Sequence, residues 1–119
     1  KDFEEVILDI EKERDTLDWC RASIRSCLWN LENPKIEQFD KDYFVKDLRV
    51  NLDKKEKAHA KLEYLKHGKL RAEMFRLNIT TTPDRFLVHI AFFNLMDAIL
   101  NQLQFELSQE KKKGPFSFH

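Results

Sequence analysis

The 119-residue sequence contains very little glycine. Its two glycines are Gly68 and Gly114, whereas glycine makes up about 7% of an average protein. Neither the GxGxxG motif of dinucleotide-binding folds nor the GxxxxGK[ST] phosphate-binding loop can be formed from them. A β-sandwich also needs many turns that contain glycine. The sequence therefore excludes these two nucleotide-binding classes and a many-turned β fold.

The sequence also lacks an excess of charge of either sign and a long hydrophobic run. It has 21 basic and 21 acidic residues, so its formal net charge is zero, and no overall field attracts it to nucleic acid or to an anionic membrane. The longest apolar stretch, residues 86–100, includes polar residues and is too short to cross a bilayer of about 30 Å. We therefore predict a folded protein with no membrane partner.

Charge is nevertheless unevenly distributed along the chain. Residues 1–18 carry eight acidic and three basic residues, while residues 53–76 carry eight basic and four acidic ones. Two interpretations fit this distribution. Either the acidic stretch packs beside the basic one, or the basic stretch is a surface that binds a partner.

The two cysteines, Cys20 and Cys27, are seven residues apart. On an α-helix, which rises about 1.5 Å per residue, this spacing separates them by roughly 10 Å. A disulfide needs Cα atoms within about 7 Å of each other, so these two cannot form one together. We expect both thiols to be reduced and packed in an apolar helix face, and the protein to be cytoplasmic.

The first thirty residues predict a long helix over residues 2–31. Apolar residues recur there at alternating intervals of three and four, which places them on one helix face. Asn33 and Pro34 end the pattern, because proline disfavours helical geometry in the residue before it. This face, which only Glu13 interrupts, consists of Phe3, Val6, Ile10, Glu13, Leu17, Cys20, Ile24, Cys27 and Leu31.

The last third of the chain predicts a second long helix, over residues 83–112. Pro83 suits the first position of a helix, and Gly114 suits its end. Most residues between 86 and 100 are apolar, as is typical of a helix that is covered on most sides. We expect residues 114–119 to form an extended tail and the two long helices to run along each other.

The middle third is ambiguous between helix and strand. Residues 35–47 fit a short helix, whereas residues 48–52 alternate between apolar and polar side chains, with the period of two that is typical of a strand. A strand there would be followed by a helix that ends near Gly68. The alternative is one continuous helix from Asp53 to Asn78, because a glycine inside a helix costs only about 1 kcal/mol.

Residues 48–79 combine the strand-like segment with a basic helix and with the segment Gly68–Arg76. This order resembles the ribbon-helix-helix family of DNA-binding proteins. In that family the strand pairs with its twofold mate and places alternate polar side chains in the major groove. By this resemblance those residues would be Arg49 and Asn51, and the protein would bind DNA as a dimer.

One set of residues has the spacing of metal ligands. Glu56, His59, Glu63 and His67 follow one another at intervals of three and four, which places them along one helix face. The first two have the Glu-x-x-His spacing of di-iron bundles, but such sites need a second pair and two further carboxylates, and the sequence has no second pair. We therefore predict no metal, no cofactor and no enzyme activity, and assign these residues to a solvated face.

Together these patterns predict an all-α protein, a single domain over residues 1–119. It would be a bundle of three to five helices with a short strand at 48–52 as the one alternative element. Aromatic side chains that lie off the buried helix faces are enriched in protein interfaces. We therefore expect a module that binds another helical protein, most simply a second copy of itself, through Trp19, Trp29, Phe92 and Phe93. The alternative is the DNA-binding dimer that uses Arg49 and Asn51.

Overall fold

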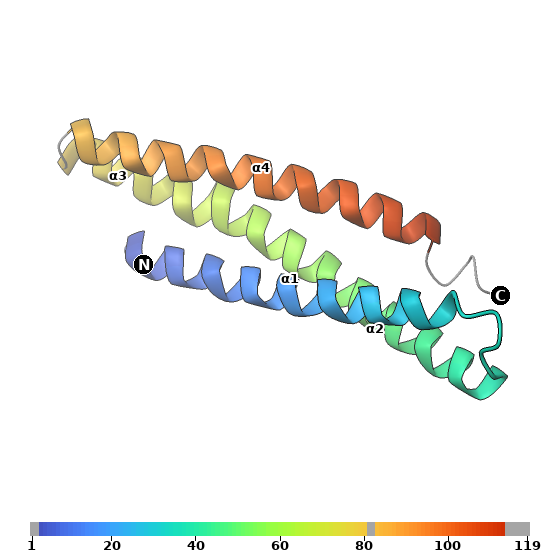
Figure 1. Ribbon diagram of the computed structural model, residues 1–119. Helices are drawn as coiled ribbons and strands as arrows, with labels where there is room; N and C mark the ends of the chain where they lie inside the picture. Colours follow the sequence, from blue (N-terminus) through green and yellow to red (C-terminus); the bar gives the residue numbers. More distant parts are fainter. Residues whose placement is uncertain (1–2, 81–82, 114–119) are drawn as a thin grey trace.

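The computed structural model describes residues 3–80 and 83–113 (Figure 1), and these residues form helices joined by one described turn. The elements in chain order are α1 (Phe3–Leu31), α2 (Gln38–Tyr64), the π-helical segment η1 (Leu65–Leu70), α3 (Arg71–Thr80) and α4 (Pro83–Lys113). Because α2, η1 and α3 follow one another without a break, they form one long middle helix. The described residues therefore form three helices and no strand, and the prediction of an all-α bundle is confirmed.

Both long terminal helices lie where the sequence predicts them. In α1, every apolar residue of the predicted face is buried. The exception in that face, Glu13, forms an ion pair of 3.0 Å with Lys61 of α2, so this contact does bring the acidic stretch beside the basic one. After α1 the side chain of Asn33 accepts a hydrogen bond of 3.0 Å from the backbone N–H of Lys35, which fixes the turn into α2.

The strand predicted at 48–52 is wrong, because these residues lie inside α2. Leu48 and Leu52 are four residues apart and are both buried, whereas Val50 between them is 43% exposed. Their core-facing spacing is therefore that of a helix, which places residues i and i+4 on one face. An alternation of only five residues did not distinguish the two structures.

The middle helix also continues through Gly68, so the alternative of one long helix is the correct one. It begins earlier than that alternative placed it, at Gln38 instead of Asp53. Gly68 lies in the π-helical segment η1, where backbone hydrogen bonds join residues five apart instead of four. The helix returns to α-helical geometry at Arg71. The tail predicted for residues 114–119 lies outside the described residues.

The middle helix is the common partner of the other two. In Figure 1, α1 and α4 both run antiparallel to it, and they pack mainly against it instead of along each other. The prediction that the two long helices run side by side is wrong in this respect. Where they approach each other, a groove of about 240 Å³ between them is lined by residues such as Arg14, Leu17 and Ile99.

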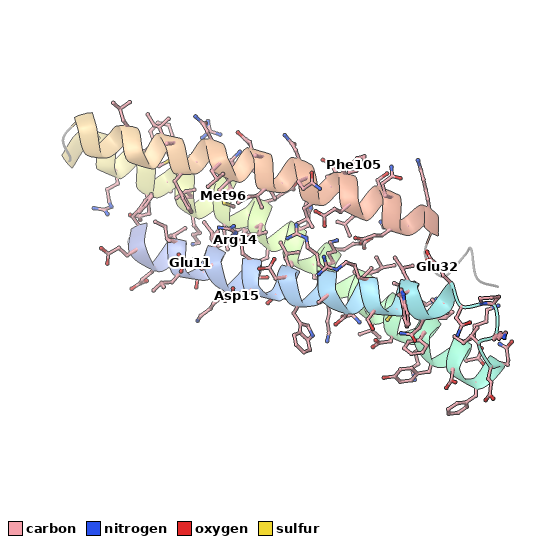
Figure 2. The ribbon with its side chains drawn as sticks, viewed as in Figure 1. Glu11, Arg14, Asp15, Glu32, Met96 and Phe105 are labelled. Atoms are coloured by element: carbon pink, nitrogen blue, oxygen red, sulfur yellow. The ribbon has the colours of Figure 1, made fainter. Side chains whose placement is uncertain are left out.

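Two hydrophobic cores hold the helices together. The first contains residues of all three helices, among them Ile10, Leu62 and Met96. Figure 2 shows Met96 on the inner side of α4 and Phe105 on its outer side. The second core contains only residues of α1, α2 and the turn between them, among them Cys27 and Leu48. The molecule is therefore a rod, 62 × 21 × 17 Å, in which the three helices pack together along the middle, α1 and α2 form one end, and α3 and α4 form the other (Figure 1). Among residues 3–80 and 83–113, no helical segment has the length and the hydrophobicity of a membrane span.

Candidate functional site

Two tryptophans project from α1 away from its buried face. The side chains of Trp19 and Trp29 are 71% and 76% exposed, because neither belongs to the spacing of the buried apolar residues of α1. Tryptophan is enriched at protein interfaces, where it offers a large apolar area and a hydrogen-bond donor. Both side chains are therefore available to a partner.

The other two predicted interaction residues, Phe92 and Phe93, lie elsewhere. Both are half-buried in α4 and pack against the first core. The ammonium group of Lys66 lies 4.5 Å from the ring centre of Phe93 and pairs with the carboxylate of Asp97, while burial lowers the pKa of this lysine. The two phenylalanines thus contribute to packing within the bundle, and the structure does not bring them together with the two tryptophans.

A cluster of charged side chains joins the three helices. Glu106 of α4 accepts two hydrogen bonds from Arg21 of α1, at 2.7 and 3.1 Å, and one of 2.9 Å from Lys55 of α2. Lys55, whose side chain is fully buried, also donates to Glu110. Gln102 donates to Glu106 at 3.2 Å. Sequence reasoning missed this cluster because Arg21 and Glu106 are 85 residues apart and no local pattern pairs them.

The cluster lowers the pKa of Glu106. Burial would raise the pKa of this carboxyl group, but the hydrogen bonds from Arg21 and Lys55 outweigh burial and lower the pKa to about 2. The carboxylate is thus charged over the whole range in which proteins normally work. Because its charge is compensated by two cations from two other helices, the cluster is suited to fixing the positions of the three helices.

This pKa predicts a loss of stability in acid. Glu106 has a lower pKa in the folded chain, about 2, than the ordinary value of 4.5 that holds for the unfolded chain. Its contribution is therefore complete above about pH 4.5 and is lost as the pH falls toward 2. A difference of one pKa unit corresponds to about 1.4 kcal/mol, so the free energy of unfolding falls by about 3 kcal/mol.

Urea unfolding at a series of pH values measures this effect. Glu106→Gln should be less stable at neutral pH and should lose about 3 kcal/mol less than the unmodified protein between pH 4.5 and 2. Asp53→Asn is the matched control, since Asp53 pairs with the exposed Lys57 on its own helix. If Glu106→Gln and the unmodified protein lose stability in parallel, the assignment of this acid sensitivity to Glu106 is wrong.

The two residues of the DNA-binding alternative do not lie on a strand. Arg49 is exposed on α2, whereas Asn51 is buried and donates a hydrogen bond of 2.9 Å to the backbone oxygen of Asp47. In a helix, residues two apart point in different directions. The ribbon arrangement on which the resemblance depends is therefore not present in the described residues.

The residues with metal-ligand spacing do not converge. Glu56 pairs with Lys111 of α4, and the ring of His59 lies 3.4 Å from the carboxylate of Glu63. The ring of His67 packs instead against Phe93, with the ring centres 6.5 Å apart. Over residues 3–80 and 83–113, no group of three or more potential ligands is arranged to hold a metal ion.

Both cysteines are buried and free, as the spacing predicts. The thiol of Cys27 donates a hydrogen bond of 3.2 Å to Asp47. Burial, together with this carboxylate, raises its pKa to about 12, and burial also raises the pKa of Cys20. A thiol needs to lose its proton before it can act as a nucleophile, so these two side chains are suited to packing.

The outer side of α1 forms what we call the acidic face. Its members recur at intervals of three and four and are exposed, and Lys12 lies beside them. The face consists of Glu4, Leu8, Glu11, Asp15 and Trp19. None of its three acids forms an ion pair with another described residue. Figure 2 shows Asp15 on the side of α1 that is turned away from α4.

A second surface, which we call the basic groove, lies on the first half of α2. It has a volume of about 570 Å³ and carries three bases and one acid. Its lining residues are Gln38, Lys41, Asp42, Val45, Lys46, Arg49 and Val50. Sequence reasoning missed both surfaces. The signal for the acidic face was present, since Leu8 and Trp19 are eleven residues apart and three helical turns place them on one side.

No protein-family model matches the chain, and comparison with the curated proteins and with the solved structures finds no significant match. Its function is therefore inferred from the geometry of its own residues.

Proposed function

We propose that this protein is a non-enzymatic interaction module that binds another helical protein surface, most simply a second copy of itself. The observation that carries the proposal is the exposure of Trp19 and Trp29 on the outside of α1. When a partner covers a side chain of this size, its apolar surface is removed from water. This stabilises the complex by about 25 cal/mol for each Å² of apolar area.

Exposed aromatic side chains on α2 support the proposal. Phe39 and Tyr43 are exposed at the end of the rod that α1 and α2 form. Aromatic side chains are enriched at protein interfaces. An assembly through these surfaces would cover side chains that the bundle itself leaves in water.

The chemistry of the interior supports the non-enzymatic part of the proposal. The buried Lys55 and the partly buried Glu106 and Arg21 satisfy one another across the three helices, and the two thiols have raised pKa values. With both thiols free, the protein would act in a reducing compartment such as the cytoplasm.

Molar mass in solution tests the proposal. The mass should rise above the monomer value of 14.3 kDa as the protein concentration is raised through tens of micromolar. Trp19→Ser/Trp29→Ser should stay closer to 14.3 kDa at each concentration, because the variant removes the largest exposed apolar side chains of α1. Phe75→Ser, an exposed aromatic position on α3, is the matched control. A monomeric mass at every concentration would remove the self-association.

The same measurement with duplex DNA at two ionic strengths tests the DNA-binding alternative. A DNA-binding protein forms a heavier complex at low salt and loses it steeply at high salt, because each neutralised phosphate releases counterions. We expect no change of mass on addition of DNA at either ionic strength.

A further inference from the structure

We infer that two copies of this chain associate by placing the acidic face of α1 from one copy in the basic groove of α2 from the other. This inference rests on the proposed self-association and names the two surfaces that meet. It draws on the position of the groove, on the charges of the two surfaces and on their dimensions.

The basic groove continues the place that α4 occupies on α2. Near the end of α4, Lys111 pairs with Glu56 of α2. Arg49 precedes Glu56 by seven residues, which places it on the same side of α2 two helical turns further on. All residues that line the groove belong to α2, so the groove is an open surface of this helix beyond its contact with the end of α4.

The bases of the groove have no ionic partner in the part of the chain that the structure describes. Lys41, Lys46 and Arg49 form no ion pair with any other described residue. This distinguishes them from Lys55 of the same helix, which is buried and pairs with Glu106 and Glu110 of α4. A partner with acidic side chains would therefore supply the opposite charges that these bases lack.

The acidic face of α1 has this chemistry. It carries three acids, whereas the groove carries three bases with one acid, Asp42, which already accepts a hydrogen bond from Gln38. Opposite charges that face each other favour the correct register and speed the encounter. The two surfaces are thus complementary in charge.

Both surfaces also offer apolar side chains beside their charges. The acidic face offers Leu8 and Trp19, which are 57% and 71% exposed, and the groove offers the half-buried Val45 and the exposed Val50. At about 1.5 Å per residue, Glu11 and Asp15 are about 6 Å apart along α1, and Lys46 and Arg49 are about 5 Å apart along α2. These two acids can therefore face these two bases while the apolar side chains lie beside them.

The face and the groove are different surfaces of the molecule, so each copy offers two places of contact. If two copies use both places on each other, they form a twofold dimer. If each copy uses its face on one neighbour and its groove on another, the contacts form rings or open chains. High salt weakens the contact, because the charges involved are exposed and are screened within about 10 Å at 0.1 M salt.

Complementary charge reversal tests the contact. One variant reverses the groove (Lys46→Glu/Arg49→Glu) and another reverses the face (Glu11→Lys/Asp15→Lys). All four side chains are exposed, so the fold should persist, which the helical circular dichroism signal checks. Each variant alone should associate at least tenfold more weakly than the unmodified protein, because like charges then meet. An equimolar mixture of the two should regain a mass well above 14.3 kDa, since every contact in it again joins opposite charges.

The control variant is Lys54→Glu/Lys57→Glu, which makes the same change of charge at exposed positions of α2 outside the groove. It should associate like the unmodified protein. If the unmodified protein associates but the two reversed variants associate equally well, or if their mixture remains monomeric, the face-to-groove contact is wrong and the proposed self-association stands. A monomeric unmodified protein overturns both.

Discussion

Replacement of Lys55 by alanine is expected to destabilise the protein by about 3–5 kcal/mol, the usual effect of removing one partner from a buried ion pair. The side chain of Lys55 is fully buried and binds both Glu106 and Glu110. Its loss leaves Glu110 without the ammonium group and leaves Glu106 with Arg21 as its one remaining cation. The two carboxylates then lie close together in a site that water reaches poorly.

Urea unfolding at neutral pH measures this loss, and Lys57→Ala is its matched control. Lys57 pairs with Asp53 at 2.9 Å, but both side chains are exposed and lie on one helix. Exposed pairs of this kind contribute about 0–1 kcal/mol. If Lys55→Ala costs no more than Lys57→Ala, the ionic cluster does not hold the three helices together.

Replacement of Leu62 by alanine should have an effect of similar size, about 2–5 kcal/mol. Leu62 lies on the middle helix, is completely buried, and belongs to the core that α1 and α4 share with it. Its truncation removes apolar contacts and leaves a cavity between all three helices. The cost depends on how far the surrounding side chains can close this cavity.

Leu95→Ala is the control for this substitution, because Leu95 lies on α4 with about half of its surface exposed. The same change of side chain should cost less than 1 kcal/mol there, since little apolar area returns to water. Thermal or urea unfolding of the three proteins compares the two positions. Equal losses at Leu62 and Leu95 would contradict the shared core.

The sequence alone was sufficient for the terminal helices. In α1, an unbroken series of threes and fours selects one face, and the same face is buried in the structure. Glu13 was visible as the interruption of this series, but its partner Lys61 was not. A local pattern identifies which side of a helix is buried, whereas the side chain that meets it comes from a distant part of the chain.

The sequence was insufficient in the middle third for a different reason. Five alternating residues at 48–52 fit a strand as well as they fit part of a helix. The structure resolves this because Leu48 and Leu52 meet α1 in the second core, while no neighbouring strand exists among the described residues to pair with them. Gly68 was equally ambiguous, because a glycine can end a helix or lie inside one. In the structure η1 packs against α1 and α4, and this packing stabilises a helix that continues through Gly68.

The ionic cluster left one signal in the sequence. Lys55 occupies a position at which the spacing of the buried residues Leu48, Leu52, Ala58 and Leu62 requires an apolar side chain. A charged residue in such a position indicates either a register error or a buried partner. The partners, on α1 and α4, became identifiable only when the three helices were placed together.

The proposed contact between copies of this protein joins the acidic face of α1 to the basic groove of α2. Its most direct test is an NMR experiment on a mixture of isotope-labelled and unlabelled protein, which detects only contacts between different copies. It should show the indole of Trp19 and the methyl groups of Leu8 close to the methyl groups of Val45 and Val50. Intermolecular contacts confined to other surfaces, or none at concentrations of hundreds of micromolar, would contradict the claim.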